Sequence, residues 1–233
     1  MKNISWQALC IEMMRESLHY KWGDIASMRG FEKLSPHAAS VAESAYCKYC
    51  NNLSHQDGLV IVFNTLGFGY RYGGMYELSL DCYKKALSLQ ESTLSKLSPL
   101  RATLYYNLAW LCEKLDDIDS ALDWYLKDLH ISEAVHGREG ISAAHTYNSL
   151  GTIYEKKKDY RKAMSNLKRA LYIFKREFGE NDTSVSAVCN NIANIYARKK
   201  QYEQAISWHE RDLKICEAVQ TILKQQSHIP IWE

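Results

Sequence analysis

The 233-residue chain has the composition of a folded protein, with 46% hydrophobic and 24% charged residues. Its net charge of +2 is too small to indicate binding driven by nucleic-acid phosphates. No apolar stretch is long enough to cross a bilayer, and Glu12 and Arg15 interrupt the first apolar pattern, so we expect neither a membrane partner nor an export signal. The seven cysteines, mostly within apolar patterns, favour a reducing compartment, and we expect a cytoplasmic protein.

Residues 1–60 predict irregular helices that form a degenerate repeat or a cap. One amphipathic helix is expected from Trp6 to Leu18 and another from Pro36 to Leu53. Cys47, Cys50 and His55 have a spacing that could hold part of a zinc site, but a second ligand pair is missing. We therefore expect no metal and no other cofactor.

From residue 61 to residue 219 the sequence repeats every 42 positions. Leu66-Gly67, Leu108-Ala109, Leu150-Gly151 and Ile192-Ala193 fall at this interval, as do Ser79, Ala121, Ala163 and Ala205. Each unit contains two apolar runs of helical spacing around a short polar break. The pattern predicts an all-α chain of four repeats, about 61–102, 103–144, 145–186 and 187–219, each a helix pair that must stack on its neighbours.

Small residues and chain breaks support this interpretation. Gly151 is expected to lie opposite Ala163 and Ala170, where two helices cross closely. Gly179 is expected to end the second helix of its repeat, and the Asp182 group to cap the next helix. Ser98 and Pro99 are expected to start a helix in the same way two repeats earlier.

Residues 220–233 are expected to complete the last helix and then to leave it, because Pro230 cannot continue a helix. The segment from Ile229 to Trp232 is apolar. It could cover the last repeat, bind another copy of the chain, or fray.

The pattern Leu150-Gly151, Tyr154, Tyr160, Ala163, Leu167 and Ala170 resembles the tetratricopeptide repeat (TPR), in a 42-residue form similar to that of kinesin light chains. The similarity is closest in Phe178–Val185, Asn190–Ala193 and Tyr202–Ala205, and Ala205–Leu213 is also similar to LGN-type scaffolds. The resemblance implies antiparallel helix pairs stacked into a right-handed superhelical array, an α-solenoid whose concave groove binds other proteins.

Asp128 and Asp212 depart from this pattern, because they stand where other repeats carry Ala86 and Ala170. A buried carboxylate without partners is costly, so each is expected to find a hydrogen-bond donor or to reach water. The stretches 126–129 and 210–213 resemble each other, which suggests a duplicated pair of repeats. We interpret both aspartates as structural variants, since they lie 84 residues apart.

In such an array the first helix of each pair lines the concave side. Each repeat carries a leucine or isoleucine followed by a small residue, as in Leu108-Ala109. We expect three residues to point inward in each repeat: the one just before that leucine or isoleucine, and those two and six positions after it. These are Asn107, Trp110 and Lys114; Ser149, Thr152 and Lys156; and Asn191, Asn194 and Arg198. We call these nine residues the inner row.

The chemistry of the inner row suits a peptide. Amides both donate to and accept from a backbone, and lysine and arginine bind carboxylates. The resemblance implies that Asn107 and Asn191 grip the ligand's main chain, whereas Asn190 should point partly toward the neighbouring helix. Trp110 is expected either to anchor a ligand or to be covered by part of the protein.

The sequence thus predicts a non-enzymatic adaptor or scaffold that binds a linear segment of another protein in its groove. Self-assembly through the last repeat or the tail is the alternative. No motif places a nucleophile beside the scattered histidines, so we expect no catalytic residues. Basic turns at 156–158 and 198–200 could touch phosphates, but the low overall charge leads us to expect no nucleic-acid partner.

Overall fold

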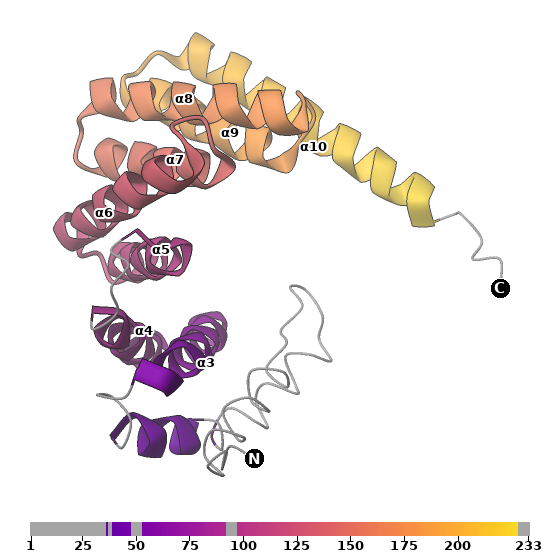
Figure 1. Cartoon of the computed structure of the whole chain (residues 1–233). Helices are drawn as coiled ribbons and strands as arrows, with labels where there is room; N and C mark the ends of the chain where they lie inside the picture. The colour runs from indigo at the N-terminus through magenta and orange to yellow at the C-terminus, as the bar shows by residue number, and fades with distance from the viewer. Residues whose placement is uncertain (1–35, 37–38, 48–52, 92–96, 228–233) are drawn as a thin grey trace. The chain divides into compact units, whose positions relative to one another are not determined.

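The computed structural model describes residues 36, 39–47, 53–91 and 97–227, whose regular structure is entirely helical (Figure 1). The helices are α3 (Leu53–Tyr72), α4 (Tyr76–Glu91), α5 (Pro99–Lys114), α6 (Ile118–His136), α7 (Ile141–Lys156), α8 (Tyr160–Phe178), α9 (Thr183–Arg198) and α10 (Tyr202–Ser227). None of the described helices is long and apolar enough to cross a membrane.

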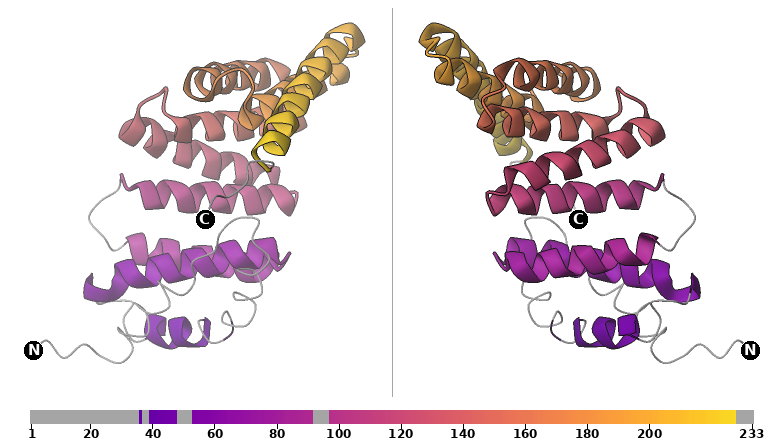
Figure 2. Two further views of the ribbon diagram at one scale, coloured as in Figure 1. Left: turned by 90° about the vertical axis from the view of Figure 1, so that its right-hand side faces the viewer. Right: turned by 90° about the vertical axis from the view of Figure 1, so that its left-hand side faces the viewer.

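The chain divides into two compact units, Met1–Leu115 and Asp116–Glu233. In unit 1, α3 packs against α4, and α5 contacts both. In unit 2, each helix from α6 to α10 packs against the next, and α7 also contacts α9 (Figure 2). Within each unit, successive helices therefore pack side by side, as the 42-residue period predicts.

The core of unit 2 is built from one face of each helix. Tyr147, Leu167, Phe174 and Ile192 are fully buried in one cluster, together with Ile215 of α10. In unit 1 the corresponding large buried side chains include Phe63, Leu66 and Tyr83.

Glycine permits close helix contact at two points. A Cβ atom added to Gly151 would lie 2.5 Å from Leu167, and one added to Gly67 would lie 2.8 Å from the ring of Tyr83. The close approach expected at Gly151 is confirmed, but its partner is Leu167 and not Ala163 or Ala170. The glycine thus accommodates a large side chain of the second helix rather than a second small residue.

The turn inside each helix pair has the same backbone form in every repeat. Gly74, Asp116, Lys158 and Lys200 follow one another at intervals of 42 residues, and all have positive φ, between 60° and 73°. In three of these turns the next amide closes the helix end, as in the 2.9 Å bond from Asp159 N to Tyr154 O. The polar break of the sequence is therefore a left-handed C-terminal cap.

The boundary between α8 and α9 is built as expected. Gly179 has φ of 85° and ends α8, and the Asp182 carboxylate caps α9 by accepting from Ser184 N at 2.7 Å. The earlier boundary differs in part. Pro99 begins α5, but Ser98 makes no side-chain capping bond.

The ends of the chain are described only in part. The helix expected from Pro36 to Leu53 is seen at 39–47, whereas the helix expected at 6–18 and the tail 228–233 lie outside the described residues. Helix α3 begins at Leu53, before the expected repeat boundary at residue 61.

Candidate functional site

The inner row lies on the first helix of each pair. Asn107, Trp110 and Lys114 are on α5, which contacts α3 in unit 1. Ser149, Thr152 and Lys156 are on α7, and Asn191, Asn194 and Arg198 are on α9. Helices α7 and α9 contact each other, so these two sets of three lie on neighbouring helices of unit 2.

In unit 1 the amide of Asn107 is almost fully buried, with 6% of the residue exposed. Its Nδ2 atom donates to Asn64 Oδ1 at 3.4 Å, and its Oδ1 atom accepts from Arg71 Nη1 at 3.1 Å. Both ends of the amide are thus engaged within unit 1, and Asn107 orients Arg71.

Arg71 lies among aromatic rings. Its guanidinium carbon is 4.7 Å from the ring centroids of both Phe68 and Trp110, and 5.7 Å from that of Tyr72. The planar guanidinium stacks on such rings while its N–H groups remain directed outward in its plane. A cation is therefore held in a defined position beside Trp110.

Trp110 is half-buried and partly covered by other side chains of unit 1, and its role as a ligand anchor stays a prediction. Arg71 lies over its ring, Lys114 Nζ is 5.1 Å from its centroid, and the Tyr76 ring meets it edge-on at 6.2 Å. We call Phe68, Arg71, Trp110 and Lys114 the cation–aromatic cluster.

Sequence reasoning missed Phe68, Tyr72 and Arg71. Phe68 and Tyr72 stand two and six positions after Leu66, so the counting rule for the inner row would have found them in the first repeat. Arg71 follows no such rule, because the equivalent positions 113 and 155 carry glutamate.

The charge at position 71 in unit 1 and at its equivalent, position 155 in unit 2, distinguishes the two units. In unit 2, Arg198 Nε donates to Glu155 Oε1 at 3.0 Å, so the cation has a partner within the protein. The equivalent pair in unit 1 is Arg71 and Lys114, two cations. No carboxylate among the described residues forms an ion pair with either of them.

The face of unit 2 is polar and internally bonded. Asn191 Nδ2 donates to Asn148 Oδ1 at 2.9 Å, which repeats the Asn107 to Asn64 bond of unit 1. Thr152 donates to the carbonyl oxygen of Ser149 at 2.7 Å. This face therefore holds half-buried amides and hydroxyls in fixed positions.

The remaining inner-row residues of unit 2 are more accessible, since Lys156, Asn194 and Arg198 are exposed. Asn194 donates to Asn190 Oδ1 at 3.2 Å. Asn190 in turn donates to Asp212 Oδ2 on α10 at 3.1 Å, which confirms that it points toward the neighbouring helix.

Both unusual aspartates have hydrogen-bond donors, as expected. Asp128 is 3% exposed and accepts from Ser132 at 3.0 Å and from Thr146 at 2.5 Å. Burial raises the pKa of Asp128 to about 6, although both hydroxyls stabilise its charged form. Asp212 accepts from Ser186 as well as Asn190.

Within the described part of the chain, no three side chains are arranged to hold a metal ion. Cys50 and the side chain of His55 lie outside the described residues, so the spacing of the cysteines with His55 stays a sequence observation. The described cysteines form no disulfide with one another, and those at positions 82, 112 and 189 are buried whereas those at 47 and 216 are exposed.

Residues 59–134 and 142–218 each match the family model of the tetratricopeptide repeat. The chain belongs to the tetratricopeptide-repeat family. Each matched stretch spans two helix pairs of this TPR protein, α3–α6 and α7–α10. The chain is an all-α solenoid, and TPR arrays generally serve as scaffolds for interactions between proteins.

Solved structures with the same fold include BtubC (BKLC) from P. vanneervenii, at 19% identity and a TM-score of 0.68 over 98% of this chain and 96% of that one. MamA aligns at 18% identity and a TM-score of 0.59, over 86% of this chain and 99% of that one. A putative kinesin light chain with nearly identical TPR-like repeats from Podosopora anserina aligns at 16% identity and 0.66, over 94% and 99%. No curated protein matches the sequence.

Proposed function

We propose that this TPR protein is a non-enzymatic adaptor that binds a linear, acidic segment of another protein through its inner row. The observation that carries the proposal is the cation–aromatic cluster. Arg71 and Lys114 both lie against Trp110, at positions where unit 2 has an internal ion pair. A carboxylate from a ligand would supply the counter-ion that unit 1 lacks.

The cluster is organised before a ligand arrives. Asn107 and two stacked rings fix the Arg71 guanidinium, so little side-chain entropy is lost when it binds a carboxylate. The half-buried ring of Trp110 offers an apolar surface next to the two cations, which suits an acidic residue adjacent to an apolar one.

The inner row of unit 2 complements this chemistry. Beyond their mutual bond, the Asn191 amide retains one N–H, the Asn148 amide retains both because it accepts through Oδ1, and the Thr152 oxygen retains its acceptor sites. Such groups suit a peptide's main chain, which both donates and accepts hydrogen bonds.

A selection from a random peptide library displayed on phage tests this function. We expect the immobilised full chain to enrich peptides that contain aspartate or glutamate. Arg71→Glu should weaken their binding by about tenfold or more, because the new carboxylate becomes an internal partner of Lys114, as Glu155 is for Arg198. Trp110→Ala should also weaken binding.

Lys84→Glu is the matched control, since it makes the same change of charge at an exposed position of α4 outside the inner row. It should leave peptide binding nearly unchanged. Peptides that bind Arg71→Glu as tightly as the natural protein would show that the cluster is not the site, provided the helical circular dichroism of the variant is intact.

A second candidate is self-assembly, which one observation favours. Leu213 and Ile206 on α10 are each 58% exposed. Leu171, which stands 42 residues before Leu213, is only 9% exposed because α9 packs next to it. The face of α10 that a further helix would cover is therefore bare in the described chain.

A further inference from the structure

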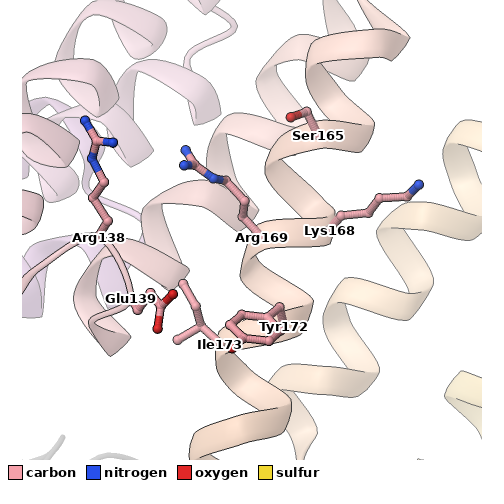
Figure 3. A pocket seen from close by; sticks show the side chains of 7 residues that line it. All are labelled: Arg138, Glu139, Ser165, Lys168, Arg169, Tyr172 and Ile173. Atoms are coloured by element: carbon pink, nitrogen blue, oxygen red, sulfur yellow. The ribbon is translucent and has the colours of Figure 1, made fainter.

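A cavity of about 470 Å³ lies outside the inner row, between α8 and the loop that joins α6 to α7 in unit 2 (Figure 3). Helix α8 lines it with Ser165, Arg169, Tyr172 and Ile173, and the loop adds Arg138 and Glu139. Lys168 also borders it but points away from the two arginines in Figure 3. The proposed peptide-binding function uses none of these residues.

The two arginines share one carboxylate. Arg169 Nη1 donates to the Tyr147 hydroxyl at 3.1 Å, and that hydroxyl donates to Glu133. Arg138 Nε is 3.6 Å from the other oxygen of Glu133. Arg138 thus approaches Glu133 directly, whereas Arg169 reaches it only through the Tyr147 hydroxyl and forms no ion pair of its own among the described residues.

Glu139 does not act as the counter-ion of Arg169, because Arg176 already binds the Glu139 carboxylate. Arg176 also donates to the Glu139 carbonyl oxygen at 2.7 Å and thereby ties the loop to α8. The loop that carries Arg138 is thus fixed beside Arg169.

In the next repeat, the position equivalent to Arg138 carries the opposite charge. Forty-two residues after Arg138 and Arg169 stand Glu180 and Arg211, which form an ion pair with each other. Lys175 Nζ lies 3.1 Å from the same glutamate. At the boundary between α6 and α7, Arg138 stands in place of the glutamate, so Arg169 bonds to the neutral Tyr147 hydroxyl instead of a carboxylate.

We propose that this cavity binds the phosphorylated side chain of a partner protein. Guanidinium groups bind phosphate oxygens in bidentate fashion, and Arg138 and Arg169 provide two of them on a fixed loop and a helix. The Ser165 hydroxyl adds a donor at the wall, and the ring of Tyr172, 58% exposed, packs against the carbon atoms that carry the phosphate.

The surrounding charges limit the site to one compact dianion. Glu133, Glu139 and Glu177 lie around the arginines, paired with Arg138 or Arg176. An extended nucleic-acid backbone would place further phosphates against these carboxylates. A single phosphate avoids them.

Titration of the isotope-labelled full chain with phenyl phosphate, followed by NMR of the backbone amides, tests the proposal. We expect saturable shifts at residues 138–140 and 165–173. Benzoate, which carries a single-charged carboxylate on the same ring, should bind about tenfold more weakly. Arg138→Glu should abolish the shifts, because the new carboxylate would pair with Arg169 as Glu180 pairs with Arg211.

Arg161→Glu is the matched control, since it changes the charge equally at an exposed position of α8 outside the cavity. It should retain binding. If Arg138→Glu melts at a lower temperature than the natural protein, Arg138→Gln serves in its place and should weaken phenyl phosphate by about tenfold. Equal binding by the natural protein and the Arg138 variants, equal affinity for benzoate, or tighter Arg138-dependent binding of single-stranded RNA would overturn the proposal.

Discussion

Asp128 carries a buried charge at a position where repeats of this chain otherwise have alanine or a less buried aspartate. Its two hydroxyl partners keep it hydrogen-bonded, but burial dominates and raises its pKa to about 6 from an ordinary value of 3.8. The folded protein therefore binds a proton more tightly than the unfolded chain does. Its stability should decrease as the pH rises from about 4 to about 6, where only the folded state retains the proton.

We expect Asp128→Asn to stabilise the protein by about 1–3 kcal/mol at about pH 7, because the amide removes the cost of the buried charge and keeps the shape of the side chain. Urea unfolding at about pH 7 and pH 4.5 measures the effect, which should fall to about a third at the lower pH, where the folded state keeps the proton but most unfolded chains have lost it. Asp212→Asn is the comparison at the equivalent, half-buried position, where the loss of an acceptor for Asn190 should lower stability slightly. A less stable Asp128→Asn protein at about pH 7 would contradict this account.

At this scale the sequence predicted which side chains lie on the first helices but not which ones organise the cluster. The position of Trp110 follows from the 42-residue period alone. Its contact with Arg71 depends on the crossing of α3 and α5 and on the amide between Asn64 and Asn107. No local pattern encodes a contact between residues on two different helices.

The helix pairs owe their uniform geometry to one left-handed residue at each inner turn. Only the first turn uses glycine, at Gly74, whereas Asp116, Lys158 and Lys200 adopt positive φ with a side chain. That conformation costs a residue other than glycine about 1–2 kcal/mol. Glycine would remove this strain but make the unfolded chain more flexible, so the net gain should be smaller.

Lys200→Gly should stabilise the protein by up to about 1 kcal/mol, because it relieves the strain at φ of 60°. Lys199→Gly is a matched neighbour with φ of −81°, where glycine relieves no strain and should destabilise by about 0.5–1 kcal/mol. Both lysines are exposed, so urea unfolding of the two variants compares backbone effects alone. Equal changes in stability at the two positions would contradict the strain argument.

The period of the sequence was sufficient to predict the helix pairs and their turns. It was less informative at the start of the array, where α3 continues upstream to Leu53. The residues there no longer match the 42-residue pattern of the later repeats. A comparison of repeats therefore cannot show where α3 begins.

At the scale of the whole molecule, the spacing of several side chains predicts a duplicated pair of repeats. Asn107 and Asn191, like Asp128 and Asp212, stand 84 residues apart, and the two family matches each span one such pair. The two aspartates differ in which neighbouring helix supplies their hydrogen-bond donors. Asp128 of α6 bonds forward to Thr146 of α7, whereas Asp212 bonds back to Ser186 and Asn190 of α9.

If the bare face of α10 mediates self-assembly, Ile206→Gln combined with Leu213→Gln should abolish it with little loss of stability, since both side chains are mostly exposed. Multi-angle light scattering over a range of protein concentrations measures the mass. Leu126→Gln, at a side chain of α6 that is 43% exposed, should leave the mass unchanged. A natural protein that stays monomeric at every concentration would exclude this second function.

The uncovered side of α10 also has a use in protein engineering. A designed hairpin that presents the small and apolar side chains of α9, such as Val185, Val188 and Cys189, would match the ridge formed by Ile206 and Leu213. Grafting successive modules there would lengthen the protein one repeat at a time, and each added module should raise the cooperativity of unfolding measured by calorimetry.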